Sequence, residues 1–197
     1  MFLVPFFKSF ITLFIITDVL GNLPFFMALS EGMTHSERLR VFTTAVAAGL
    51  LLLVFFLLIG MAILDLFKVT LDDFKIAGGI LLLLISAEIL LRGKINVEHK
   101  EDIGIFPLAC PLLVGPGAIT TSLVLLKLYG YPTTLGAIFA CFFLVWIILY
   151  FSEPIYNFLG RNGSLILTKI AAILIAAIAV QFIRQGIISV LFNKPII

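Results

Sequence analysis

Long apolar runs separated by short polar connections make up most of this sequence. Each run is close to the roughly 20 mostly apolar residues that a helix needs to cross the hydrocarbon core of a bilayer. The expected spans are Pro5–Leu29, Val41–Leu64, Phe74–Leu91, Ile103–Leu126, Leu128–Ser152 and Leu165–Ile183. The pattern therefore predicts an all-α, polytopic membrane protein with six transmembrane helices.

Composition supports a membrane protein and excludes other classes. Hydrophobic residues make up 62% of the chain and charged residues 12%, whereas a soluble domain has roughly 45–50% apolar and about 25% charged residues. The basic residues are scattered and the net charge is only +2, so no nucleic-acid partner is expected. Lys8 precedes the first apolar run, but no small-residue cleavage site follows. We therefore interpret this run as a mature span and not as a cleaved signal.

The cysteines and histidines predict neither a metal site nor a cofactor. Cys110 and Cys141 lie in apolar runs, where a free cysteine acts as a small buried hydrophobe. His35 and His99 lie in polar connections, where we expect them to be solvated. The sequence also contains no nucleotide-binding loop, so we expect no ATP-driven step in this chain.

One sequence offset relates the two halves of the chain. Gly21 and Gly115 are 94 residues apart, and the same offset separates the Lys-Ile-Ala triplets that begin at Lys75 and Lys169. Each half would contain an odd number of spans, so the second half would enter the membrane inverted, as in many transporters. We predict a single transmembrane domain with one repeat over 1–93, a charged linker over 94–102 and a second, inverted repeat over 103–197.

Glycine and proline interrupt the first and fourth expected spans at corresponding places, in Gly21–Pro24 and in Gly115–Gly117. Backbone groups freed by such a break are tolerated inside a membrane only where they face protein or a cavity. Pro116 suits the first turn of a new helix, which would leave the following N–H groups free to bind a carboxylate. Paired interruptions predict a binding site, although two structural kinks remain the alternative. The expected substrate-binding residues are Gly21, Asn22, Leu23, Pro24, Gly115, Pro116, Gly117, Ala118, Thr120 and Thr121.

Two acidic residues are candidates for coupling transport to an ion or a proton. Asp18 lies one turn before the first interruption, and a carboxylate at that depth costs at least ~2.5–3.5 kcal/mol unless it meets a cation, a proton or a polar cavity. Capping of the broken helix is the alternative role for Asp18. Glu88, near the end of the third span, could pair with Arg92 or Arg184 or lie at an entrance. Lys75 and Lys169 are expected to be anchors at the membrane interface.

These segments resemble the MarC family, also described as the six-span neutral amino acid transporter family and related to the LysE-type exporters. The resemblance rests on Asp18-Val19-Leu20-Gly21-Asn22-Leu23-Pro24, on Pro111-Leu112-Leu113-Val114-Gly115-Pro116-Gly117-Ala118-Ile119-Thr120-Thr121 and on Ala179-Val180-Gln181-Phe182-Ile183. It covers nearly the whole chain and departs at Val19, where the family commonly has proline. The resemblance implies a multi-pass protein of a prokaryotic plasma (inner) membrane that carries small neutral amino acids such as glycine and alanine, with serine and threonine as further candidates.

The resemblance also implies coupling of transport to Na⁺ or H⁺, as in a symporter. An exporter of other small solutes or drugs is the nearest alternative. Two alternatives belong to other classes: an intramembrane enzyme, which would need a nucleophile–base pair or a metal cluster at depth, and a membrane assembly subunit, which would need no broken helices. We expect no enzyme activity. A homo-oligomer is compatible with the sequence. Lys and Arg are almost evenly divided between the two sides, so the positive-inside rule gives only a slight preference, for termini outside.

Overall fold

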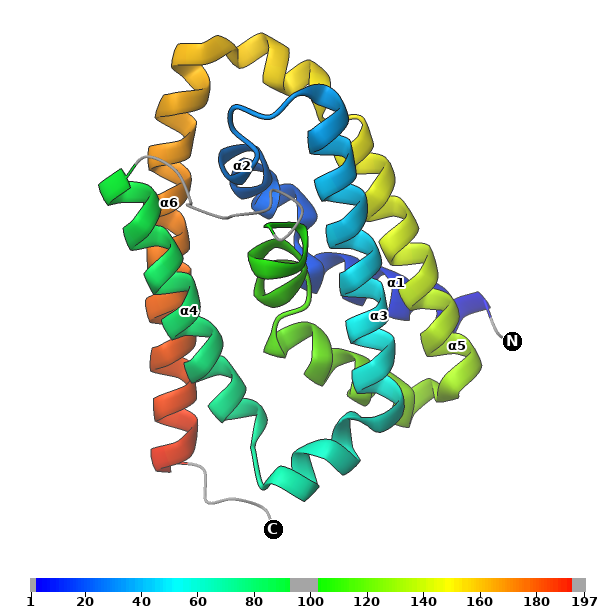
Figure 1. The fold of residues 1–197 in the computed structure, drawn as a ribbon. Helices are drawn as coiled ribbons and strands as arrows, with labels where there is room; N and C mark the ends of the chain where they lie inside the picture. Colours follow the sequence, from blue (N-terminus) through cyan, green and yellow to red (C-terminus); the bar gives the residue numbers. More distant parts are fainter. Residues whose placement is uncertain (1–2, 93–102, 193–197) are drawn as a thin grey trace.

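The computed structural model describes residues 3–92 and 103–192, and the regular structure of these residues is helical (Figure 1). The elements are α1 (Leu3–Thr17), α2 (Val19–Leu29), α3 (His35–Phe67), α4 (Leu71–Arg92), η1 (Gly104–Leu113), α5 (Pro116–Tyr150) and α6 (Glu153–Phe192). The all-α prediction is therefore confirmed for the described residues. His99 and the linker expected over 94–102 lie outside them.

Among the residues that the structure describes, five stretches of helix are long and apolar enough to cross a membrane. They are Leu3–Leu29, His35–Gly60, Leu71–Leu91, Pro116–Tyr150 and Thr168–Phe192. The fourth expected span is not one of them, because the chain divides it between the short η1 and the beginning of α5. The multi-pass architecture is thus confirmed, whereas the count of six spans stays a prediction.

A bend divides α5 into two helical pieces. As one straight helix, its 35 residues would measure about 50 Å, well beyond the ~30 Å of a hydrocarbon core. Gly130 has φ 77° and ψ 172°, a backbone conformation that only glycine adopts readily. Figure 1 shows the first piece crossing the centre of the molecule before the second turns upward. The bend lies where the sequence predicts a connection, between residues 127 and 132.

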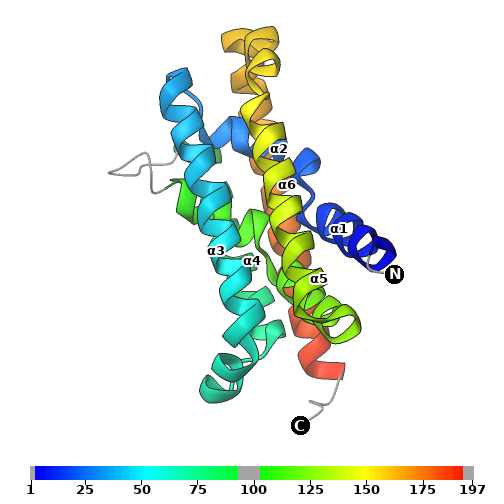
Figure 2. The same cartoon turned by 90° about the vertical axis from the view of Figure 1, so that its right-hand side faces the viewer.

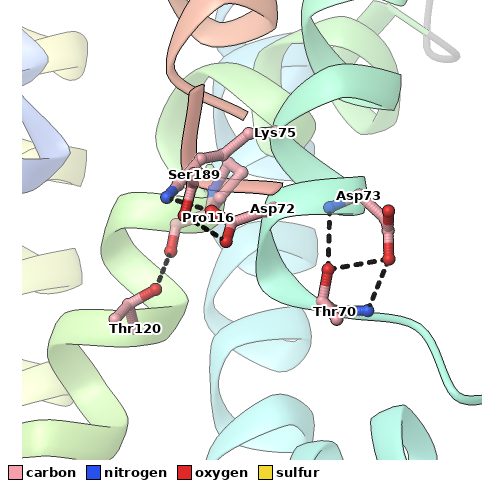
Figure 3. Close-up of polar contacts among 7 residues, drawn as sticks. All are labelled: Thr70, Asp72, Asp73, Lys75, Pro116, Thr120 and Ser189. Carbon is pink, nitrogen blue, oxygen red and sulfur yellow. Dashed lines mark hydrogen bonds and ion pairs between the residues drawn. The ribbon is translucent and has the colours of Figure 1, made fainter. Parts of the chain in front are cut away.

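Side-chain and backbone caps fix the ends of α3 and α4. The hydroxyl of Thr34 accepts the N–H of Glu37 at 3.3 Å, and the Glu37 carboxylate accepts the N–H of Thr34 at 2.8 Å. Thr70 and Asp73 repeat this reciprocal arrangement at the start of α4, as Figure 3 shows. Lys68 follows α3 with φ 52°, the left-handed conformation that ends many helices. The intervening turn is therefore short and well defined.

One expected connection is wrong. The polar stretch Glu153–Ser164 is predicted as a loop, but α6 begins at Glu153 and runs for 40 residues. Pro154 lies in the first turn, where its fixed φ and missing N–H cost nothing. The polar residues that follow thus extend a transmembrane helix beyond its apolar part instead of ending it.

Corresponding elements of the two halves run in opposite directions. In Figure 1, α3 descends while the second part of α5 ascends, and α4 ascends while α6 descends. Packing is reciprocal as well: α1 contacts α5, η1 contacts α3, and α4 and α6 share the most extensive interface. Figure 2, viewed from the side, shows α1 projecting from the bundle beside α5. These directions are those an inverted repeat requires; a two-fold superposition of the halves stays a prediction.

Small residues allow the helices to approach closely. A Cβ on Gly79 of α4 would lie 2.7 Å from the carbonyl oxygen of Ala179 on α6. A Cβ on Gly49 of α3 would lie 3.0 Å from the Phe142 ring on α5. Large apolar side chains such as Leu51 instead lie on the outer surface, where lipid is the solvent. Close backbone approach is a principal source of helix association in a membrane.

The two adjacent glycines of α4 supply a matched test of this packing. We predict that Gly79→Ala destabilises the protein by about 1–3 kcal/mol, because the new methyl group would overlap the α6 backbone. Gly78→Ala is the control, since its Cβ would lie 3.6 Å from Pro111, an ordinary contact. Unfolding in detergent measures both. Equal stability of the two variants would contradict the assigned interface.

Candidate functional site

The first interruption is a single residue, Asp18, between α1 and α2. Asp18 has φ 43° and ψ 48°, a left-handed conformation that aspartate and asparagine tolerate better than most residues. Its carboxylate accepts the N–H of Gly21 at 3.2 Å and so caps α2. The prediction of non-helical backbone within 18–24 is therefore confirmed at Asp18, whereas Gly21–Pro24, where glycine and proline suggest the interruption, is helical. Pro24 lies inside α2, where it removes only the bond to the carbonyl four residues earlier.

The second interruption ends at Val114 and Gly115, between η1 and α5, and η1 is itself interrupted by extended backbone at Phe106 and Cys110. Gly115 is extended, with φ −87° and ψ 176°, and α5 begins at Pro116, which confirms the break predicted within 111–117. Gly115 also contributes the first helical acceptor, because its carbonyl binds the N–H of Ile119 at 3.2 Å. The N–H groups of Gly117 and Ala118 precede that bond. Among the described residues, no side chain caps this end of α5.

Asn22 joins the two interruptions. Its side-chain amide donates to the carbonyl oxygen of Thr17 at 3.1 Å and to that of Leu112 at 3.4 Å. The first carbonyl belongs to the end of α1 and the second to the end of η1, so each is freed by a break in a helix. The Asn22 side chain is buried, with 8% of its surface exposed. The interruptions predicted from opposite halves of the sequence therefore contact each other through one amide.

The surroundings of the second break are tight. A Cβ on Gly115 would lie 2.9 Å from the Pro111 carbonyl oxygen and 3.7 Å from the ring of Phe182 on α6. A Cβ on Gly117 would meet Ile16 of α1 at 3.5 Å. Ala118 is 2% exposed, so its methyl group packs in the core. The surface here is mostly backbone, bounded by side chains of α1 and α6.

The two candidate threonines lie beyond this break, along another surface. The hydroxyl of Thr120 donates to the Pro116 carbonyl at 2.7 Å within its own helix (Figure 3). The buried hydroxyl of Ser122 does the same with Ile119. Thr120 and Thr121 both line a groove between α1 and α5 that also contains Lys8. Within the described part of the chain, no hydrogen bond joins Thr120 or Thr121 to Asn22.

The remaining charged candidates lie on α4 and α6. Lys75, expected as an interface anchor, makes an ion pair with Asp72 at 2.7 Å, and Asp72 also accepts the hydroxyl of Ser189 at 2.6 Å (Figure 3). Glu88 is half-buried on α4. It lies about 15 Å along the helix from Gly78, the α4 residue against Pro111, because each residue advances a helix by ~1.5 Å. Glu88 is thus separated from the second break.

Some polar contacts escaped the sequence analysis. Glu31, in the turn after α2, accepts the hydroxyl of Thr168 on α6 at 2.6 Å. The Asp72–Lys75 spacing of three residues is a signal that the sequence does contain. The groups that accept hydrogen bonds from Asn22 are backbone carbonyls, which every residue has, so the sequence contains no signal for these contacts. Cys141 is buried against Thr17, with 3.9 Å between its sulfur and the threonine hydroxyl oxygen.

The fold and the joined interruptions define an integral membrane protein with broken helices. The model of the MarC family integral membrane proteins matches residues 3–191, and the chain belongs to this family. A UPF0056 membrane protein of Archaeoglobus fulgidus is 40% identical in an alignment of 195 positions that covers 92% of each chain. The UPF0056 membrane protein YhcE of Escherichia coli is 30% identical in an alignment of 200 positions that covers 92% of this chain and 91% of the relative. No solved structure matches. The relation to LysE-type exporters stays a prediction.

A substitution of Asn22 tests whether its side-chain amide stabilises the contact between the two breaks. We predict that Asn22→Ala lowers the free energy of unfolding by about 1–3 kcal/mol, because it leaves two buried carbonyls without a donor. Ser122→Ala is the control: it removes an equally buried polar group that binds only its own helix. Unfolding by a denaturing detergent measures both changes. If the control loses as much stability as the test variant, Asn22 has no special role.

Proposed function

We propose that this MarC-family protein is a secondary transporter of small neutral amino acids, coupled to Na⁺ or H⁺. The observation that carries the proposal is the contact of two broken helices through Asn22 and Leu112, next to the uncapped beginning of α5. Broken helices that meet within a membrane protein are a common way to build a substrate site, since they present backbone groups where no water competes.

The substrate carboxylate is assigned to α5 and not to α2. The two helix beginnings differ in one respect: Asp18 already occupies the N–H of Gly21, whereas Gly117 and Ala118 receive no side-chain cap among the described residues. Free N–H groups at a helix beginning, together with the helix dipole, favour a negative charge. The beginning of α2 is thus satisfied from within the protein, and that of α5 is available to a ligand.

The substrate ammonium is assigned to the side of the first break. Asp18 is exposed, and its backbone carbonyl accepts the N–H of Asn22 at 2.9 Å, so its carboxylate and the Asn22 amide belong to one short segment. A zwitterion would then have an anion-binding helix end on one break and a carboxylate on the other. Asp18 would serve equally to bind Na⁺ or to carry the coupled proton.

Small residues set the size of the substrate. Gly115 and Gly117 offer backbone, and Ile16 and Phe182 bound the space around them. A backbone surface has donors for a carboxylate but little apolar area for a large side chain. The proposal therefore expects glycine and alanine to bind, serine and threonine to bind less well, and leucine and phenylalanine to be excluded.

Two substitutions at Gly117 test the size of the site. We predict that Gly117→Val weakens glycine binding at least about tenfold, equivalent to ~1.4 kcal/mol, because the branched side chain would fill the space in front of the N–H groups. Gly117→Ala should bind glycine almost normally, since its methyl group would make an ordinary 3.5 Å contact with Ile16. Equilibrium binding of labelled glycine to the purified protein measures both. Wild-type binding by the valine variant would place the substrate elsewhere.

Asp18→Asn tests the coupling role without removing the cap. Asparagine keeps a side-chain oxygen for the Gly21 N–H and tolerates the left-handed backbone, so the variant should fold and insert. We predict that it loses ion-dependent glycine flux in proteoliposomes because the negative charge is gone. Asp73→Asn, which alters an exposed cap at the start of α4, is the control. Unchanged flux and ion dependence in Asp18→Asn would leave capping as the sole role of Asp18.

A further inference from the structure

A groove on the outer side of the molecule is separate from the two breaks. It lies between α1 and the first part of α5 and has a volume of about 550 Å³. Its lining residues are Lys8, Ile11, Thr12, Thr120, Thr121, Val124, Leu125, Leu128 and Tyr129. We call it the α1–α5 groove. Its volume is within the range of ligand-binding pockets.

The walls of the α1–α5 groove continue the lipid-facing surface. Ile11 is 52% exposed, Val124 49% and Leu128 65%. Phe7 and Ile15, one turn to either side of Ile11 on α1, are also exposed. A groove that opens sideways among such residues meets acyl chains and not water. Its occupant therefore has a hydrocarbon part.

The charge of the groove is positive. Lys8 is the only charged residue among the described residues that line the groove, and α1 contains no other charged residue. Within the described part of the chain, no acidic side chain pairs with Lys8. An ammonium group on a lipid-exposed helix is costly unless it reaches the interface or meets a counter-charge. An anion in the groove would supply that counter-charge.

The hydroxyl groups of the groove are divided into two sets. Thr12 donates to the Lys8 carbonyl at 2.8 Å, and Thr120 donates to the Pro116 carbonyl, so both are used within their own helices. Thr121 and Tyr129 have no hydrogen-bond partner among the described residues. The ammonium group of Lys8 on α1 and the hydroxyls of Thr121 and Tyr129 on α5 are therefore available to bind the oxygens of a phosphate.

The stacked aromatic face of α1 holds one wall in place. Phe6, Phe10 and Phe14 stack with ring centroids 6.5 Å and 6.3 Å apart. A Cβ on Gly136 would lie 3.5 Å from the Phe6 ring, so Phe6 of α1 lies close to the backbone of the second part of α5. The groove is thus a preformed feature between two packed elements.

We propose that the α1–α5 groove binds one anionic phospholipid. Its phosphate contacts Lys8, with Thr121 and Tyr129 as further donors, and one acyl chain lies along Ile11, Val124 and Leu128. Lipid binding at this groove is independent of the proposed transport, because it requires only the exposed residues of the outer surface and the charge of Lys8. Basic pockets between membrane helices recognise lipid headgroups by this chemistry.

Native mass spectrometry of the full chain in a neutral detergent tests the proposal. The protein is mixed with equal amounts of phosphatidylglycerol and phosphatidylcholine that carry the same acyl chains. Wild-type protein should retain one phosphatidylglycerol in preference to phosphatidylcholine. Lys8→Gln should reduce this preference about fivefold, the effect of one basic residue near an anionic lipid. Lys169→Gln is the control, because Lys169 is exposed on α6, outside the groove, and should leave the preference unchanged.

A second variant tests the hydrocarbon part. Val124→Trp would fill the groove from an exposed position and should abolish retention of phosphatidylglycerol, while an unchanged melting temperature in detergent shows that the fold is intact. Equal retention of the two lipids by the wild-type protein, or an unchanged preference in Lys8→Gln, would overturn the proposal. Displacement of the lipid by inorganic phosphate would assign the groove to free anions, and displacement by glycine would assign it to the solute path; either result also overturns it.

Discussion

A backbone polar group inside a bilayer has no water to bind, and this constraint governs the whole arrangement of the chain. Two helices are nevertheless interrupted. The freed groups at the first interruption are bound by Asp18 and Asn22, and Asn22 also binds a carbonyl of the second. One buried amide therefore binds one freed carbonyl of each break. Such an amide holds together two segments that are distant in sequence and belong to different halves.

Close helix packing follows from the same constraint. Because apolar side chains gain nothing by leaving lipid for protein, helices associate where small residues let backbones approach. Gly79 and Gly186 bring α4 and α6 together, with Cβ positions less than van der Waals distance from the backbone of the opposite helix. This interface places Phe182 of α6 beside Gly115. The packing of the outer helices thus helps to enclose the second break.

The sequence predicted the class of fold and the matched interruptions, because apolar runs, glycine and proline are local signals. It predicted that the first helix breaks within 18–24 but not at which residue: Gly21 and Pro24 suggest the interruption, whereas the left-handed residue is Asp18. The polar residues over 153–164 also led to the prediction of a loop, whereas in the structure they continue a helix. The contact of Asn22 with the Leu112 carbonyl could not be predicted, because it depends on how the halves pack and not on any residue pattern.

The central claim is that the joined breaks form the site of a coupled transporter for small zwitterions. Uptake of labelled glycine by proteoliposomes, with a Na⁺ gradient, a proton gradient or neither, tests it most directly. The account predicts accumulation of glycine above its external concentration with one of the two gradients, and equilibration or no uptake without a gradient. Failure of either gradient to drive accumulation, or uptake of leucine without uptake of glycine, would contradict it.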